Sequence, residues 1–281
     1  MTVIEAIQKS TEFLGKKNVE SPRLQTELLL AYLLKMPRMK LYLNFDRVLL
    51  PVEIDSLREL IKRRGQREPL QHIVGSTSFC GYEISVTRNV LIPRPETELL
   101  AELGWKFLLE RQTPTALDFG TGSGCIAIAL AAKCPNAKIT ALDVSADALA
   151  LAKQNALQNQ AAERIEFLLG DGFAALAGKT QFDLLMSNPP YIASAEIETL
   201  DPEVKDFDPR GALDGGADGL DFYRRLAAEA KPFLKPDGKI MLEFGDGQAD
   251  DIKKILDNEK WIVEALQDDY SQRARILIAH K

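Results

Sequence analysis

The sequence predicts an α/β protein: a doubly wound, mainly parallel seven-stranded sheet with a small N-terminal helical-bundle domain and a β-hairpin linker. From Thr115 onward, short apolar segments alternate with helical segments, whereas the first seventy or so residues show only helical periodicity. The length of 281 residues fits a medium domain plus a small one. The net charge of −6 divides into +4 for residues 1–72 and −10 for residues 73–281, which supports a boundary near residue 72.

Residues 1–72 are predicted to form an N-terminal helical domain. Ser21 is expected to cap a helix that has Pro22 in its first turn, and a further helix is expected to begin near Pro51. The basic run Lys62–Arg64 falls where a helix C-terminus favours cations. That run therefore fits either the end of a helix or a surface that binds an acidic partner.

Residues 73–93 are predicted to form a β-hairpin linker, because Phe79, Tyr82 and Ile84 alternate around the turn Cys80-Gly81. The third part comprises residues 94–281. It is expected to begin with a helix that has Pro95 in its first turn and reaches about Glu110.

The remainder of the chain alternates between strands and helices. The predicted strands are Ala116–Phe119, Lys138–Asp143, Ile165–Leu169, Phe182–Ser187, Lys239–Phe244, Ile262–Leu266 and Arg275–Ala279. The predicted helices are Cys125–Lys133, Ala146–Asn159, Leu220–Leu234 and Gln248–Asn258. In such a sheet, ligands bind beyond the carboxyl ends of the strands, so functional residues are expected there. Only Ile192–Gly219 reads as a long irregular stretch.

Composition excludes several classes of protein. A pI near 5.2 argues against a protein that coats nucleic acid. The three cysteines have no CxxC spacing, so neither a disulfide framework nor a metal site is predicted. The N-terminus resembles no signal peptide, and no segment has the length and hydrophobicity of a membrane span, so we expect a cytoplasmic protein.

A glycine-rich loop follows the first predicted strand of the sheet. Asp118 to Gly124 reads Asp-Phe-Gly-Thr-Gly-Ser-Gly and leads directly into a helix, a pattern that lets a ligand approach the backbone closely. The next strand ends in Asp143, which is placed to accept hydrogen bonds from ribose hydroxyls. The third ends before Asp171-Gly172-Phe173, where an acid and an aromatic ring suit an adenine. These residues predict a nucleoside site, although the glycines alone also permit a nicotinamide dinucleotide.

The motif Asn188-Pro189-Pro190-Tyr191 follows the fourth strand. A rigid turn explains its prolines but not the flanking Asn and Tyr. The Asn188 side-chain carbonyl and the Pro189 backbone carbonyl can both accept from a planar NH2 group, Pro190 stiffens the turn, and Tyr191 offers a stacking surface. The motif therefore predicts a site that holds an amide or aminopurine nitrogen in line with an activated methyl group.

Together these motifs resemble class I S-adenosylmethionine-dependent methyltransferases with a Rossmann-like fold. Three further segments, Glu68–Gly75, Leu91–Glu98 and Phe207–Gly216, closely resemble the HemK family of peptide chain release factor N5-glutamine methyltransferases. The resemblance covers nearly the whole chain. It implies methyl transfer from S-adenosyl-L-methionine to the glutamine of the Gly-Gly-Gln motif in bacterial-type class I release factors, with S-adenosyl-L-homocysteine as the other product.

The resemblance also implies roles for individual residues. The implied cofactor-binding residues are Asp118, Gly120, Thr121, Gly122, Ser123, Gly124, Asp143, Asp171, Gly172, Phe173 and Asn188. Asn188, Pro189 and Tyr191 are the implied catalytic residues, and with Pro190 they hold the substrate. Arg94, Glu96 and Glu98 are placed near the cofactor or substrate entrance, or cap a helix. We expect a monomer whose N-terminal domain recognises the release factor without direct contact to nucleic acid or membrane.

Three alternatives remain open from the sequence. A nucleic-acid amino methyltransferase would use the same tetrapeptide but is expected to have a basic groove, which the −10 of the second part does not favour. An NAD-dependent oxidoreductase leaves Asn188–Tyr191 without a role. A catalytically silent binding module would bind without turnover, and titration with the two cofactors separates the oxidoreductase from the rest.

Overall fold

The computed structural model describes residues 1–176 and 181–281, which divide into two compact units. Unit 1 comprises Met1–Ser76 together with Asp201–Phe207, and unit 2 comprises Thr77–Leu200 and Asp208–Lys281. A short segment from the predicted irregular stretch therefore belongs to the helical unit, although residues 77–200 lie between the two parts of that unit in sequence. No helix in the described ranges is both long and apolar enough to cross a membrane.

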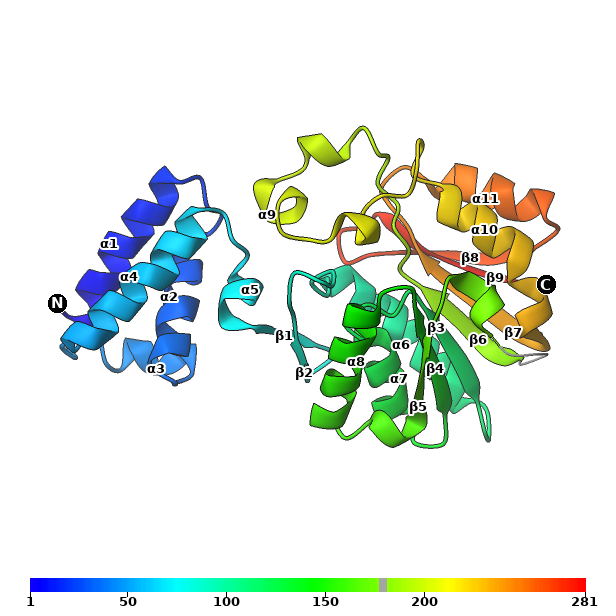
Figure 1. Ribbon diagram of the computed structural model, residues 1–281, viewed down its shortest axis with the longest axis horizontal. Helices are drawn as coiled ribbons and strands as arrows, with labels where there is room; N and C mark the ends of the chain where they lie inside the picture. The colour runs from blue at the N-terminus through cyan, green and yellow to red at the C-terminus, as the bar shows by residue number, and fades with distance from the viewer. Residues whose placement is uncertain (177–180) are drawn as a thin grey trace. The chain divides into compact units, whose positions relative to one another are not determined.

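Unit 1 is helical, as the sequence predicts (Figure 1). Its helices are α1 (Val3–Lys16), α2 (Pro22–Leu33), α3 (Arg38–Tyr42), α4 (Pro51–Gly65), α5 (Leu70–Val74) and α9 (Pro202–Lys205). Thr2 and Glu5 form a capping box on α1, which satisfies backbone groups that a helix start leaves unpaired. The prediction that the Ser21 side chain caps α2 is wrong, because Ser21 has a left-handed backbone and its side chain makes no capping hydrogen bond.

The basic run at the end of α4 is largely paired inside unit 1. Arg63 binds both carboxylate oxygens of Glu68. Arg64 is buried and donates to Glu203 at 2.8 Å, and Arg67 pairs with the same carboxylate. Glu203 lies on α9, so this ion-pair cluster holds the Asp201–Phe207 segment to unit 1. These arginines are thus occupied by structural contacts.

Unit 2 contains the predicted sheet, and its seven strands lie in the order β5-β4-β3-β6-β7-β9-β8. These strands are β3 (Thr115–Phe119), β4 (Lys138–Asp143), β5 (Ile165–Leu169), β6 (Phe182–Ser187), β7 (Leu234–Glu243), β8 (Ile262–Asp268) and β9 (Ala274–His280). Neighbours from β5 to β7 pair in parallel, whereas β9 is antiparallel to both β7 and β8. The doubly wound, mainly parallel sheet is confirmed.

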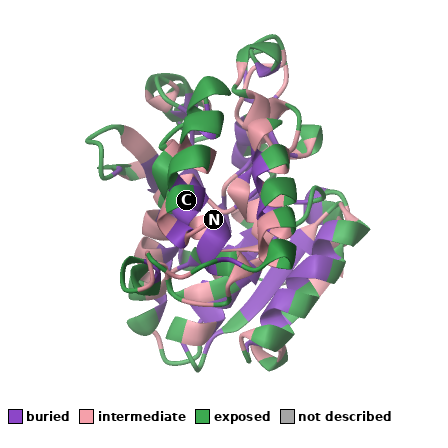
Figure 2. Ribbon diagram, turned by 90° about the vertical axis from the view of Figure 1, so that its left-hand side faces the viewer, coloured by how far each residue is buried: buried purple, intermediate pink, exposed green. Residues whose placement is uncertain are grey.

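Helices cover both faces of the sheet. The α-helices of unit 2 are α6 (Pro95–Leu109), α7 (Cys125–Lys133), α8 (Ala146–Gln158), α10 (Asp221–Glu229) and α11 (Ala249–Asn258). Its 3₁₀ turns are η1 (Ala162–Arg164), η2 (Gly172–Ala175), η3 (Ile197–Thr199), η4 (Arg210–Ala212) and η5 (Lys231–Phe233). Ala116 of β3 packs with α6 and α7, whereas Leu117 packs with α10 and α11, as expected for side chains that alternate along a strand. The central strands β3, β4 and β6 are mostly buried, whereas β8 at the sheet edge is not, and the helices expose their outer surfaces (Figure 2).

The parallel register aligns the carboxyl ends of the central strands. Phe119 of β3 pairs with Leu142 of β4, and Asp143 pairs with Leu169 of β5. Asp118 is level with Met186 of β6. The loops that carry the predicted motifs therefore leave the sheet at one edge.

The predicted hairpin is formed by β1 (Ser76–Phe79) and β2 (Tyr82–Ser85). Cys80 and Gly81 have φ values of 51° and 85°, as a tight two-residue hairpin turn requires. The hairpin is held to α8 by Asn155, which is fully buried. Asn155 exchanges two hydrogen bonds with the backbone of Ser85 and donates a third to the Ser123 carbonyl.

We predict that Asn155→Ala lowers the free energy of unfolding by about 3 kcal/mol, because it leaves backbone groups of two loops without their partners. Asn159→Ala is the control, since Asn159 also bonds to the hairpin backbone but lies nearer the surface, and we expect a loss below about 1 kcal/mol. Urea unfolding of both variants measures the difference. Equal losses of unfolding free energy in the two variants would show that Asn155 is not the main residue that holds the hairpin to α8.

Candidate active site

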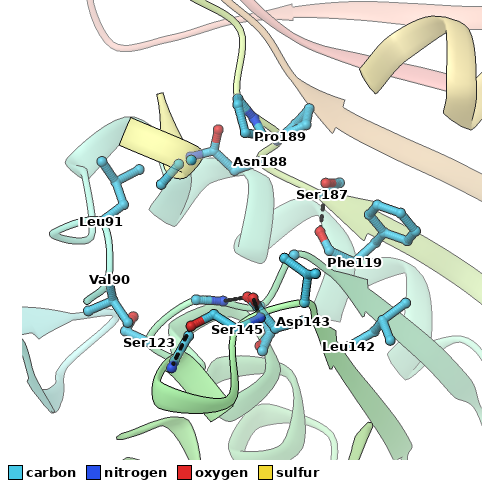
Figure 3. A pocket seen from close by; sticks show the side chains of 18 of the residues that line it. Val90, Leu91, Phe119, Ser123, Leu142, Asp143, Ser145, Ser187, Asn188 and Pro189 are labelled. Atoms are coloured by element: carbon cyan, nitrogen blue, oxygen red, sulfur yellow. Dashed lines mark hydrogen bonds between the residues drawn. The ribbon is translucent and has the colours of Figure 1, made fainter. Parts of the chain in front are cut away.

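A cavity of about 270 Å³ lies at the carboxyl ends of β3, β4, β5 and β6 (Figure 3). Its wall includes the glycine loop, Asp143, the Gly170–Gly172 turn, and Asn188 to Pro190. Residues from the hairpin exit and from the start of α6 complete it. The cavity thus lies at the strand ends, where the sheet topology predicts a ligand.

The glycine loop forms the floor of the cavity and leads into α7. Gly120, Thr121, Gly122 and Ser123 line it. An added Cβ on Gly120 or Gly122 would meet no atom within 4 Å, so the backbone there is open to a ligand. Gly124 serves packing instead, because its φ is +82° and an added Cβ would lie 3.0 Å from the Ala152 Cβ of α8.

Asp118 lies beneath this loop and does not line the cavity itself. It is buried, and its Oδ2 accepts from the Thr121 hydroxyl at 2.6 Å and from the Ala127 amide at 3.1 Å. Burial raises the pKa of Asp118 to about 7, against the effect of these hydrogen bonds. Its role is to hold the loop and the start of α7 together.

Asp143 ends β4 and faces the cavity, as predicted (Figure 3). One carboxylate oxygen accepts from the Gly122 amide at 2.8 Å, and the other accepts from the Ser145 amide at 2.9 Å. Each oxygen keeps lone-pair capacity for a ligand hydroxyl. Asp143 therefore shapes the glycine loop and can also bind a ribose.

The turn after β5 presents Asp171 and Gly172 to the cavity, but not Phe173. Phe173 does not line the cavity: it is buried, stacks on Phe233, and its ring centroid lies 5.0 Å from that of Phe119. Gly172 has a φ of +68°, and this turn directs the next side chain into the core.

Arg225 of α10 occupies the space beside Gly172 and was not foreseen from the sequence. Its guanidinium donates to the Asp171 carboxylate at 2.5 Å and to the Asp171 carbonyl at 3.1 Å. A Cβ on Gly172 would collide with this guanidinium. Arg225 thus forms part of the cavity wall where the sequence predicts the aromatic ring of Phe173.

The Asn-Pro-Pro-Tyr segment leaves β6 at the rim of the cavity, and Asn188, Pro189 and Pro190 line it. The Asn188 Nδ2 donates to the Thr97 hydroxyl at 3.1 Å. The Asn188 Oδ1 is buried, and no other described residue donates to it. An acceptor that is buried without a donor is costly, which makes it a strong candidate for contact with a substrate NH2.

Tyr191 does not line the cavity with the other three residues of the motif. Its side chain packs against the core of the second sheet face, and burial raises its pKa to about 12. Its carbonyl accepts from the Gln248 side chain at 2.9 Å. These contacts fix the exit of the tetrapeptide.

Arg94, Glu96 and Glu98, the charged residues before and within α6, differ in whether they line the cavity. Arg94 lines the cavity and pairs with the buried Asp208 carboxylate at 2.6 Å. Burial raises the pKa of Asp208 to about 6, and the Arg94 charge opposes that shift. Glu98 accepts from the Cys80 amide at 2.7 Å and, like Glu96, does not line the cavity. Of the three, only Arg94 lines the cavity.

The sequence reasoning missed two more residues: Thr97, which lines the cavity, and Glu243, which is level with Asn188 at the end of β7 but does not line the cavity. Thr97 stands inside the Leu91–Glu98 segment, so it could have been found there. Glu243 is an acid at the end of an apolar strand. Its side chain is only 1% exposed, and such burial is rare for a glutamate without a specific role. Within the described ranges, no cluster of three or more His, Cys, Asp or Glu residues could hold a metal ion.

The sheet order and the cavity together place the chain in the class of Rossmann-like methyltransferases. A solved methyltransferase from Pyrococcus furiosus shares this fold, with a TM-score of 0.51 and 22% identity over 72% of this chain and 90% of that chain. The family described as PrmC N-terminal domain matches residues 5–75, and the family described as methyltransferase small domain matches residues 97–201.

Two curated relatives identify a particular family within this class. The release factor glutamine methyltransferase of Geobacter sulfurreducens is 45% identical over 254 residues, which is 89% of this chain and 87% of that protein. The release factor glutamine methyltransferase of Chlorobaculum tepidum is 40% identical over 275 residues, covering 95% and 93%. This chain belongs to the release factor glutamine methyltransferase family.

Proposed function

We propose that the protein transfers the methyl group of S-adenosylmethionine to the side-chain amide nitrogen of the glutamine in the Gly-Gly-Gln motif of class I release factors. Family membership supports this substrate. The single structural observation that carries the proposal is the buried Asn188 Oδ1, an acceptor at the cavity rim without a donor among the described residues.

The cavity residues suit the proposed cofactor. Gly120 and Gly122 leave the loop backbone open for its methionine part, and Asp143 offers carboxylate oxygens to its ribose. The Gly172 turn and Arg225 form a wall for its adenine. When bound, S-adenosylmethionine supplies an electrophilic methyl group.

The residues of the tetrapeptide then act on the substrate amide. An amide nitrogen is a weak nucleophile because its lone pair is delocalised, so orientation is the main task of the protein. The Asn188 Oδ1 and the Pro189 carbonyl accept from the NH2 group and direct its lone pair toward the cavity. The same hydrogen bonds stabilise the positive charge that grows on nitrogen as its bond to the methyl carbon forms and the methyl–sulfur bond of the cofactor breaks, and the methylated nitrogen then loses one proton to water.

The parts of the chain have separate proposed roles. Residues 1–72 are proposed to recognise the release factor, 73–93 to link the parts, and 94–281 to carry out methyl transfer. We propose a cytoplasmic monomer that makes no direct contact with nucleic acid or membrane. Because Arg63 and Arg64 are engaged in contacts within unit 1, we do not assign recognition to those two side chains.

The test is incubation of the full chain with labelled S-adenosylmethionine and a purified unmethylated release factor, followed by mass spectrometry of the product. We expect one added methyl on the Gly-Gly-Gln glutamine. Duplex DNA and ribosomal RNA serve as competing substrates. Methylation of either nucleic acid, with an unmodified release factor, would overturn the proposal in favour of a nucleic-acid methyltransferase.

We predict that Arg225→Ala raises the Kd for S-adenosylmethionine about three- to tenfold, because the variant loses a wall of the adenine site and the contact that holds Asp171. Arg224→Ala is the matched control: Arg224 is the neighbouring residue on α10, pairs with Asp218 and Asp221, and does not line the cavity. Calorimetric titration of both variants measures the effect. Equal Kd values for the two variants would remove Arg225 from the cofactor site.

A further inference from the structure

The Asn188 carboxamide must present its oxygen to the substrate, and its own shape does not ensure this. A half-turn about its last side-chain bond exchanges the acceptor Oδ1 for the donor Nδ2. With Nδ2 toward the cavity, the Asn188 NH2 group would face the substrate NH2 group, and two donors cannot form a hydrogen bond with each other. Some neighbouring group must therefore select one orientation.

Thr97 is the direct partner of the carboxamide, with its Oγ1 3.1 Å from the Asn188 Nδ2. It lies in the first turn of α6 and is almost fully buried. A hydroxyl both donates and accepts, so Thr97 alone would tolerate either orientation of Asn188. The choice depends on what the hydroxyl itself donates to.

Glu243 supplies an acceptor that cannot donate when it is ionised. It follows Leu242, which pairs with Ser187 of β6, so Glu243 lies beside Asn188 at the strand ends, and hydrogen bonding with the Thr97 and Asn188 side chains lowers the pKa of its buried carboxyl. Its backbone carbonyl accepts from the buried Tyr223 hydroxyl at 2.8 Å, which fixes this strand end. If the Thr97 hydroxyl donates to the Glu243 carboxylate, Oγ1 can only accept from Asn188, and the Asn188 oxygen is left to face the substrate.

We infer that Thr97 and Glu243 are positioning residues that orient the Asn188 carboxamide for the substrate amide. This inference rests on the proposed function, because it concerns the same amide-binding group. Thr97 lines the cavity beside Asn188 and bonds to its Nδ2, whereas Glu243 does not line the cavity, so the role assigned to both is exerted through Asn188.

The orientation depends on the ionisation of Glu243. Burial raises the pKa of Glu243 to about 7, while hydrogen bonding with Thr97 and Asn188 and the charge of Arg275 on β9 lower it. Glu96 on α6 raises it, and Tyr191, whose own pKa is raised to about 12, stays neutral. The carboxylate predominates above about pH 7. As the pH falls through that value, the protonated carboxyl can itself donate to Thr97, and the selection of one orientation is lost.

The kinetic test compares Thr97→Val, Thr97→Ser and Glu243→Gln at several pH values. We expect Thr97→Val to lower kcat about tenfold or more with an unchanged Kd for S-adenosylmethionine, and Thr97→Ser to restore most of it. Glu243→Gln should show at every pH the low rate that the native protein shows well below pH 7. Thr26→Val, which removes another buried threonine hydroxyl in unit 1, should keep the native rate.

A spectroscopic test separates this inference from the proposed function. The side-chain NH2 signal of Asn188, assigned by its absence in Asn188→Asp, should titrate near pH 7 in the native protein and not in Glu243→Gln. If the Asn188 signal titrates but no methyl group is transferred to a release factor, the inference stands and the proposed function is wrong. Methyl transfer with a signal that does not titrate, and with a native rate in Thr97→Val, would overturn the inference alone.

Discussion

Asn188→Ala is expected to lower kcat for methyl transfer about 100-fold or more while changing the Kd for S-adenosylmethionine less than about threefold. The variant removes the buried Oδ1 that the substrate NH2 is proposed to use, so the loss falls on the transition state, where charge grows on nitrogen. The glycine loop and Asp143 do not bond to the Asn188 side chain, so cofactor binding keeps its contacts.

The measurement is single-turnover kinetics with saturating cofactor, combined with calorimetry for the Kd. Asn89→Ala is the matched control, because Asn89 is another carboxamide at the cavity but is exposed and bonds to Asp147. We expect its rate to stay within about twofold of the native rate. A near-native rate for Asn188→Ala would assign Asn188 a structural role.

The strands of the sheet could be predicted because each is a short apolar run between polar breaks. Lys138–Asp143 and Phe182–Ser187 have the predicted bounds, since buried parallel strands have apolar side chains on both faces. Once the strands are known, the parallel register places Asp143 and Asn188 at one edge. The general location of the site therefore follows from the sequence.

The parts of the site that could not be predicted come from segments distant in sequence. Arg225 is one of two adjacent arginines on α10, and only the packing of this helix brings it over Gly172. Phe173 follows an acid and a glycine, as a ring above a nucleoside would, but the positive φ of Gly172 turns it onto Phe233. Local pattern cannot distinguish these two directions for a side chain.

The stretch after Tyr191 shows the same limit. It lacks periodicity, so the sequence indicates only an irregular loop. The structure assigns Asp201–Phe207 to unit 1, where Glu203 pairs with Arg64 and Arg67. These partners precede Glu203 by more than a hundred residues, and single charged residues give no sign of such a pairing.

Asp143→Ala is expected to raise the Kd for S-adenosylmethionine about 100-fold. Hydrogen bonds to a charged acceptor contribute about 1.5–3 kcal/mol each, and every 1.4 kcal/mol corresponds to about tenfold in affinity. The variant loses the acceptor proposed for the ribose. It also frees the Gly122 amide and the Ser145 amide, whose bonds to Asp143 hold the loop and the start of α8 in their binding geometry.

Asp147→Ala distinguishes a specific contact from a general loss of negative charge near the cavity. Asp147 lies in the first turn of the same helix, is exposed and does not line the cavity, so its removal changes the net charge equally but leaves the loop intact. Calorimetry should give a Kd within about twofold of native for this control. A similar loss in both variants would mean that long-range electrostatics, rather than the carboxylate at the end of β4, governs cofactor affinity. A loss of affinity in Asp143→Ala alone, measured where both variants remain folded, would identify Asp143 as the residue that couples loop geometry to cofactor binding.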